Sequence, residues 1–238
     1  MQTDLNYEMT EKGIALSEWE FVVLCNVCSI RSLICFEKKE GLPGEEEIVQ
    51  TVMGLVQRGV VINQDDSFRL GTDAAPIFKG IQNRKFTMMI RSEENEAPDS
   101  CFYFGEGDYY ILAQPGAREG EYVILKQLPK NMLGTYLEQS GFIPRASVPE
   151  DIVEIMKSLG NGENAGDGLS ITSPDQVKNE RFMAEFYSGS LDERVTSLYV
   201  LRDKGSELLV EFSDSVQYAD YYRESDLLER ILALTGRL

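Results

Sequence analysis

Apolar spacing in the first third of the chain predicts two helices in succession. Ser17 and Glu20 form a capping box that starts a helix running to about Ser29. A second helix is expected over 45–58, and Gly59 suits the left-handed position that ends it. Apolar residues of this second helix recur at helical spacing and should form one buried stripe: Ile48, Val49, Val52, Leu55 and Val56.

A short hairpin and a third helix are expected next. Two apolar runs, 60–62 and 68–70, flank the polar residues 63–67, which is the pattern of a β-hairpin. Thr72 can cap a further helix over 73–81. Helix, hairpin and helix in this order have the outline of a winged helix-turn-helix.

The rest of the chain alternates between strand and helix patterns. Strands are expected over 86–90, 101–104, 109–113, 122–126, 182–187, 195–201 and 208–212, and helices over 129–139, 150–159 and 225–234. Strands followed by a helix that ends at glycine thus occur twice. These patterns predict an α+β fold with antiparallel β-meanders flanked by helices, pseudo-repeated halves and a winged-helix-like N-terminal segment.

This order divides the chain into four stretches, which could still form one continuous domain. They are a winged-helix-like segment (1–82), a first meander with its helices (83–160), a flexible linker (161–170), and a second meander with the C-terminal helix (171–238).

Charge changes what the winged segment is expected to do. The chain carries 40 acidic and 23 basic residues, a net charge of −17, and no histidine. Residues 45–82 contain six acidic residues and three basic ones, Arg58, Arg69 and Lys79. Because phosphate contacts supply most non-specific DNA affinity, we expect this segment to serve protein contact or packing rather than DNA reading.

Candidate chemistry is sparse. Cys25 and Cys28, with Cys35 and Cys101, could hold zinc, but a structural zinc site normally pairs two such dyads, so buried structural cysteines are favoured. The glycine-rich stretch 160–166 lacks the spacing and the following lysine of a phosphate loop. Paired carboxylates are too abundant to indicate catalysis. We therefore expect no catalytic residue, cofactor or metal.

Location and membrane contact follow from the apolar runs. The first ten residues lack the apolar core of a signal peptide, and no apolar run is long enough to span a bilayer. We therefore expect a cytoplasmic protein that does not insert into membranes and whose cysteines are reduced.

Two stretches in the N-terminal third of the chain resemble a known family. Residues 16–21 (Leu-Ser-Glu-Trp-Glu-Phe) and 55–61 (Leu-Val-Gln-Arg-Gly-Val-Val), followed by Asp66, look like the EspG family, cytosolic chaperones of type VII secretion. The likeness covers 14–82. It departs from the family pattern in the spacing of the first helix start, in Val60 where leucine is usual, and in Ser67 where glycine is usual. Beyond residue 82 only the order of elements agrees. The resemblance implies a non-enzymatic, pseudo-symmetric α+β protein that grips the tip of a helical secretion substrate.

The leading hypothesis is a cytoplasmic, non-enzymatic adaptor or chaperone that binds a protein, with a helical type VII secretion substrate as the partner that the resemblance implies. The alternative is a transcription-related winged-helix regulator with residues 84–238 as its sensor. An enzyme using carboxylates or a cysteine is a third class. The partner is expected on the C-terminal half, around the hairpin 194–212 and the final helix, because both faces of that hairpin are apolar and any part left uncovered would be a docking site. Exposed tyrosines are good partner anchors, and the residues expected to bind are Tyr199, Leu201, Tyr218, Tyr221 and Tyr222.

Overall fold

The structure is a computed structural model, and it describes the chain in separate stretches. These stretches are residues 13–30, 44–64, 67–92, 99–115, 122–147, 149, 152–153, 173–178, 180–189, 193–203 and 206–237. The fold is α+β: within these stretches, five α-helices accompany antiparallel strands. Two compact units interleave along the chain, unit 1 being Met1–Thr87 with Ser100–Lys130 and unit 2 being Met88–Asp99 with Asn131–Leu238. No helix in the described stretches is long and apolar enough to cross a membrane.

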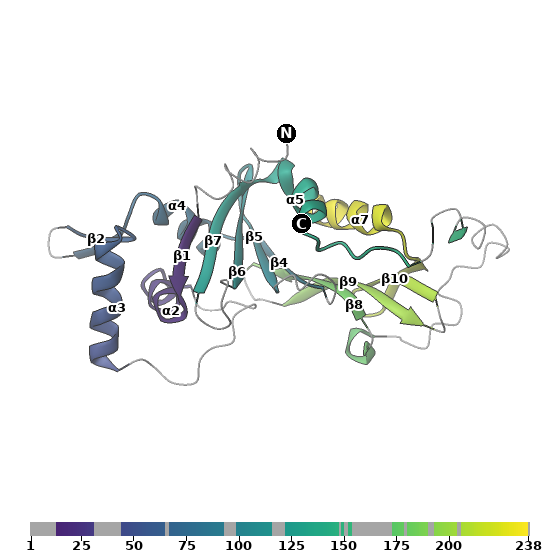
Figure 1. Cartoon of the computed structure of the whole chain (residues 1–238), viewed down its shortest axis with the longest axis horizontal. Helices are drawn as coiled ribbons and strands as arrows, with labels where there is room; N and C mark the ends of the chain where they lie inside the picture. Colours follow the sequence, from purple (N-terminus) through teal and green to yellow (C-terminus); the bar gives the residue numbers. More distant parts are fainter. Residues whose placement is uncertain are drawn as a thin grey trace. The chain divides into compact units, whose positions relative to one another are not determined.

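Unit 1 combines a strand group with the helices and the hairpin of the N-terminal segment (Figure 1). Its elements are β1 (Gly13–Ser17), α2 (Glu18–Val27), α3 (Glu45–Gln57), β2 (Val61–Gln64), β3 (Ser67–Leu70), α4 (Ala74–Gln82), β5 (Ser100–Phe104), β6 (Tyr109–Pro115) and β7 (Tyr122–Pro129). Four strands pair antiparallel in the order β1-β7-β6-β5, and β2 pairs with β3 as a separate hairpin. Within this unit α2 lies between α3 and the four strands.

Local signals explain where these helices start and stop. The backbone N–H of Glu20 donates to Ser17 Oγ at 3.2 Å, and the N–H of Ser17 donates to Glu20 Oε2 at 2.8 Å, so the expected capping box is confirmed. Gly59 has a φ of 71°, which confirms its role at the end of α3. Asp73, and not Thr72, is the residue that precedes α4.

Aromatic side chains fill the core of unit 1. The rings of Phe86 and Phe104 stack with centroids 4.4 Å apart, and Phe21 of α2 meets Phe78 of α4 at 6.3 Å. All four side chains are buried. Burying rings of this size is a large source of stability, so α2 and α4 are fixed by what they pack against as much as by their caps.

Unit 2 is an antiparallel strand group with two helices that pack on each other (Figure 1). Its elements are β4 (Phe86–Ser92, which begins in unit 1), the 3-10 turns η1 (Lys130–Met132) and η2 (Pro174–Gln176), α5 (Leu133–Gln139), β8 (Glu180–Ser188), β9 (Arg194–Asp203), β10 (Ser206–Phe212), β11 (Val216–Tyr221) and α7 (Glu224–Arg237). The strands follow the order β4-β8-β9-β10-β11.

Several expectations need correction. Residues 13–17 and 216–221 form strands β1 and β11, which the sequence patterns did not predict. Of the buried stripe expected in α3, Leu55 is buried, Val52 and Val56 are part-buried, and Ile48 and Val49 are exposed, so the expectation is wrong for these last two. Cys101 is disulfide-bonded, whereas all four cysteines were expected to be reduced. Almost all of the helix expected over 150–159, and the linker 161–170, lie outside the described residues.

Candidate functional site

Three of the five expected partner-binding residues are buried in unit 2. Tyr199, Leu201 and Tyr222 expose 4%, 1% and 2% of their surface, while Tyr218 and Tyr221 of β11 are part-buried. The expectation that all five present a surface is therefore wrong for the first three. The reason is tertiary packing. The alternation of residues along β9 could not show that both faces of the β9–β10 hairpin are covered.

Tyr199 and Leu201 point into one apolar cluster. Tyr221 packs at the edge of this cluster. The buried members of the cluster come from four neighbouring strands and are Met183, Tyr199, Leu201, Leu208, Val210, Phe212 and Ala219. The Tyr199 ring meets the Phe212 ring edge-on at 5.7 Å. The opposite face is buried too, through Leu198 and Val200.

Glu185 is the charged centre beside this cluster. This buried carboxylate accepts hydrogen bonds from the Tyr187 hydroxyl (2.5 Å), the Tyr199 hydroxyl (3.2 Å) and Arg194 Nη1 (3.0 Å). Burial and the nearby Glu185 charge raise the pKa of Tyr199 to about 12, and they raise the pKa of Tyr187 as well. Both phenols therefore stay protonated near neutral pH and act as donors, which gives the group a structural role.

Tyr222 and a buried ion pair hold the stretch 144–147 against unit 2. The Tyr222 hydroxyl donates to the Pro144 carbonyl at 2.5 Å. Arg181 is paired with Glu207, and both are buried. Arg181 Nη2 also donates to the Arg145 carbonyl at 3.0 Å, and the Ser147 N–H donates to Glu207 Oε2 at 2.9 Å. Tyr222 thus holds the stretch 144–147 in place through its hydroxyl and is not available to a partner.

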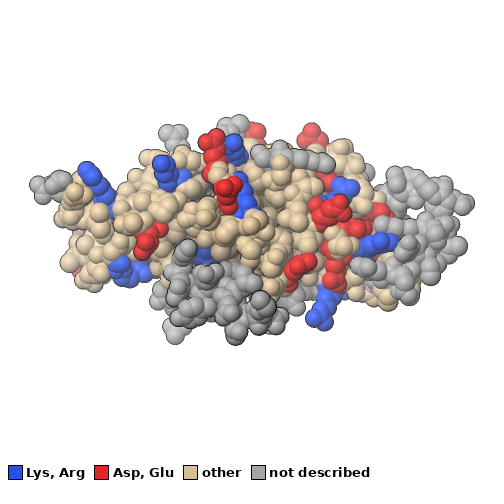
Figure 2. Space-filling view, turned by 90° about the horizontal axis from the view of Figure 1, so that it is seen from above, with Lys and Arg blue, Asp and Glu red and all other residues tan. Residues whose placement is uncertain are grey.

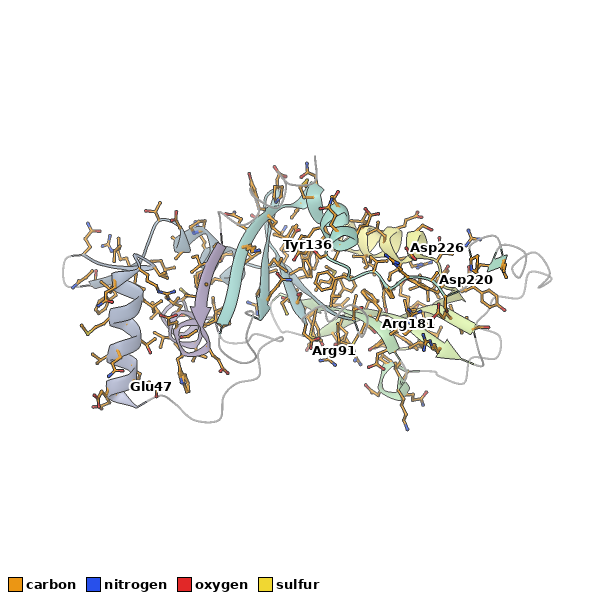
Figure 3. The ribbon with its side chains drawn as sticks, viewed as in Figure 1. Glu47, Arg91, Tyr136, Arg181, Asp220 and Asp226 are labelled. Carbon is orange, nitrogen blue, oxygen red and sulfur yellow. The ribbon has the colours of Figure 1, made fainter. Side chains whose placement is uncertain are left out.

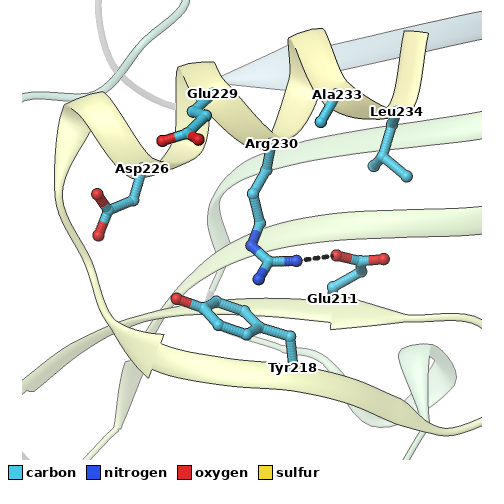
Figure 4. Close-up of a pocket in the computed structure, with 7 residues that line it drawn as sticks. All are labelled: Glu211, Tyr218, Asp226, Glu229, Arg230, Ala233 and Leu234. Carbon is cyan, nitrogen blue, oxygen red and sulfur yellow. Dashed lines mark hydrogen bonds and ion pairs between the residues drawn. The ribbon is translucent and has the colours of Figure 1, made fainter. Parts of the chain in front are cut away.

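Tyr218 lines a hollow of about 330 Å³ beneath α7 (Figure 4). The other residues around it are Glu211, Asp226, Glu229, Arg230, Ala233 and Leu234. The Arg230 guanidinium lies 3.4 Å from the centre of the Tyr218 ring and donates to Glu211 Oε2 at 2.5 Å. Because Arg230 already occupies the face of the tyrosine and pairs with the carboxylate, the principal groups of this hollow are satisfied internally. Figure 2 shows acidic side chains gathered on the side of the view where α7 lies in Figure 1.

Cys25 and Cys28 show no sign of reactivity. Burial raises the pKa of Cys25 to about 12, and it also raises the pKa of Cys28. A thiol with a raised pKa is a poor nucleophile and metal ligand at neutral pH. Among the described residues no group of three or more Cys, Asp or Glu side chains is placed to hold a metal ion.

Exposed apolar side chains lie instead on α3 and, separately, on the β2–β3 hairpin of unit 1. We call Ile48, Val49, Val52, Met53 and Val56 the α3 apolar face. Val49 and Met53 are 56% and 57% exposed, Ile48 is 38% exposed, and the two remaining valines are part-buried. Ile62 and Phe68 of the hairpin are exposed as well. Half of the ten exposed large apolar residues in the described stretches belong to these two elements.

The way α3 packs on α2 explains this exposure. Gly54 faces α2, since a Cβ there would lie 3.6 Å from Glu20 Oε1. Arg58 Nη2 lies 2.7 Å from Glu20 Oε2, and Arg58 Nη1 donates to the Ala15 carbonyl at 2.8 Å. Gly54 and Arg58 are one helical turn apart, on a different side of the helix from the apolar face. Amphipathic spacing predicted the stripe, but it could not show that α3 would pack through another side.

Acidic residues form the first turn of α3, and the basic residue that follows α3 is already paired with a carboxylate. Glu45, Glu46 and Glu47 form the first turn of α3 and are exposed, and Figure 3 shows Glu47 at that end of the helix. Arg58, the basic residue that follows α3, is paired with Glu20. Comparisons of the chain with family models and with curated proteins found no match.

Proposed function

We propose that this protein is a non-enzymatic adaptor or chaperone that binds another protein. The observation that carries the proposal is the α3 apolar face, of which Ile48, Val49 and Met53 are exposed to solvent. Contiguous exposed apolar surface costs solubility, and on soluble proteins it is typical of a binding site. The EspG-like residues of the first two helices favour the same class, with a helical secretion substrate as the partner. They also favour a cytoplasmic location, which the disulfide at Cys101 opposes.

The arrangement of elements fits this function through shape. The order α2, α3, β2–β3 hairpin and α4 resembles the outline of a winged helix, and we propose that the wing and α3 are used for protein contact. The two strand groups with their helices are consistent with the pseudo-repeated halves that the resemblance implies. The C-terminal half keeps Tyr218 and Tyr221 as part-exposed positions for a second contact.

The winged order also favours one alternative, a transcription-related regulator that reads DNA through α3. The first turn of α3 opposes it, because Glu45, Glu46 and Glu47 would face phosphates. A filter-binding assay at low salt separates the two functions. An adaptor should show no tight DNA binding, whereas tight and strongly salt-dependent binding would establish the regulator.

Affinity capture from the native host tests the adaptor function itself. The wild-type chain and the double variant Val49→Ser/Met53→Ser are used as baits, and the recovered proteins are quantified by mass spectrometry. We expect a small helical protein to be recovered by the wild type and depleted with the variant. Recovery of general chaperones alone by both baits, together with turnover of a metabolite by the purified chain, would contradict the proposal.

A further inference from the structure

We propose that the α3 apolar face binds one amphipathic helix of the partner, with lysine or arginine residues bordering that helix's apolar stripe. This inference rests on the proposed protein-binding function and names the chemistry of the partner. Three features of the surface carry it: the spacing of its apolar residues, the sign of the charges around it, and the absence of a free base on α3 among the described residues.

Spacing indicates a helical occupant. Val49, Val52 and Val56 follow one another at intervals of three and four residues, and Ile48 and Met53 widen the same stripe. This is the spacing with which two helices pack side by side. The 13 residues of α3 form a rod of about 20 Å at 1.5 Å per residue, long enough for several turns of a second helix.

Charge indicates a basic occupant. Glu45 and Glu46 are exposed in the first turn of α3 next to the apolar face, whereas Glu47 shares the helix side of Gly54, seven residues further on. The guanidinium of Arg58 cannot offset them, because it pairs with Glu20 and bonds the Ala15 carbonyl. Arg69 in β3 is an exposed base of the hairpin, so the basic side chains of the partner should lie at the glutamate end and not over the hairpin.

The same charges disfavour other occupants. A second copy would bring another Glu45–Glu47 turn and another net charge of −17, which opposes association. A nucleic acid or an anionic membrane surface would be repelled for the same reason. A basic amphipathic helix, by contrast, gains apolar burial along α3 and attraction at the start of α3 in one binding mode.

Peptide binding tests the inference. Two labelled probe peptides of about five helical turns carry the same leucine stripe at three- and four-residue spacing, one bordered by lysines and one by glutamates. A third peptide has the lysine peptide's composition in scrambled order. Fluorescence anisotropy with the full chain at low salt should show the lysine peptide binding at least about tenfold more tightly than either other peptide, a difference of about 1.4 kcal/mol.

Variants of the chain assign the binding to this surface. Val49→Ser/Met53→Ser should weaken the lysine peptide by about tenfold or more, because it removes exposed apolar contact area. Glu45→Gln/Glu46→Gln should weaken the same peptide and flatten its salt dependence. Val195→Ser alters an exposed apolar residue of β9 in unit 2 and should change neither the affinity nor its salt dependence. Because all these side chains are exposed, the variants should keep the melting temperature of the wild type.

Three results would overturn the inference: equal binding of the scrambled peptide, equal binding of the glutamate peptide, or unchanged affinity of Val49→Ser/Met53→Ser. A dimer in sedimentation experiments that dissociates in that variant would assign the face to a second copy instead. If capture from the host still depends on Val49 and Met53 while the lysine peptide fails, the protein-binding function stands and only the basic-helix inference falls.

Discussion

Arg58 and Glu20 join α3 to α2 across 2.7 Å, measured from Nη2 to Oε2. The Glu20 carboxylate serves two roles at once, since its Oε2 also accepts the Ser17 N–H of the capping box. The Glu20 side chain is 14% exposed and that of Arg58 is 43% exposed, so solvent screens the pair only in part. This contact lies on the side of α3 that faces α2, which is not the side of the exposed residues Val49 and Met53.

Replacing Glu20 should therefore cost more stability than replacing Arg58. Arg58→Ala loses an ion pair and one bond to a carbonyl, and we expect a loss of about 1 kcal/mol. Glu20→Ala also opens the capping box, and we expect a loss of about 2 kcal/mol. Urea unfolding measures both, with Gln57→Ala on the exposed side of α3 as the control, expected within about 0.5 kcal/mol of the wild type.

A double-mutant cycle checks the cause. In the Glu20→Ala background, Arg58→Ala should cost less than it does alone, by the coupling energy of the pair, about 0.5–1 kcal/mol. Equal losses for Arg58→Ala in both backgrounds would show that the two side chains do not act together.

Local signals in the sequence predicted local structure well. The Ser17–Glu20 capping box and the Gly59 stop were predicted correctly because each depends on atoms within a few residues. The β2–β3 hairpin was predicted correctly for the same reason. By contrast, β1 pairs with β7, about a hundred residues away, and no local pattern reports such a partner.

Burial was the property that the sequence could not assign. Ile48 and Val49 of α3 were expected inside, since a stripe shows which residues share a side but not which part of that side meets the core. Tyr199 and Tyr222 were expected outside, because their cover comes from segments distant in the chain. The candidate surface therefore emerged in unit 1 and not on the C-terminal half.

The buried pair Arg181–Glu207 predicts a pH dependence of stability. Burial alone would raise the pKa of Glu207, but the hydrogen bonds from Ser147 and the Arg181 guanidinium outweigh it, and the pKa is lowered. A lowered folded-state pKa contributes stability above the ordinary glutamate range near pH 4.3, and this stability is lost as pH falls through the folded value. Glu207→Gln should thus lose about 2 kcal/mol at neutral pH and progressively less in acid.

Unfolding free energies at several pH values, for the wild type and Glu207→Gln, measure this difference. Glu229→Gln on the exposed side of α7 is the matched control, expected to show a small and nearly pH-independent change. A Glu207→Gln deficit that stays constant down to strongly acidic pH would show that the carboxylate charge is not its source.

Tyr222→Phe should loosen the stretch 144–147. The change removes the hydroxyl that donates to the Pro144 carbonyl and leaves that carbonyl without this donor, for a loss of about 1–3 kcal/mol. The neighbouring N–H groups of Ala146 and Ser147, which donate to Glu224 and Glu207, should exchange faster with solvent deuterium.

Hydrogen-exchange mass spectrometry reads out that stretch directly. Tyr109→Phe is the control, because Tyr109 is 52% exposed, and its stability and exchange should match the wild type. Unchanged exchange at residues 146–147 in Tyr222→Phe would mean that the ion pair alone holds this stretch in place.

Gly71 tests how closely the hairpin approaches the end of α3. A Cβ at this position would lie 2.0 Å from the Gly59 carbonyl oxygen, and the Gly71 N–H donates to the Val60 carbonyl at 2.8 Å, so backbone faces backbone. Gly59 cannot easily yield, since its φ of 71° is already in the left-handed region. Gly71→Ala should therefore cost about 3 kcal/mol or more in thermal or urea unfolding.

Gly236→Ala, where the added Cβ meets open space in α7, should leave stability unchanged or raise it slightly. If Gly71→Ala had the same melting temperature as the wild type, the close contact between Gly71 and Gly59 would not be what holds the hairpin against α3.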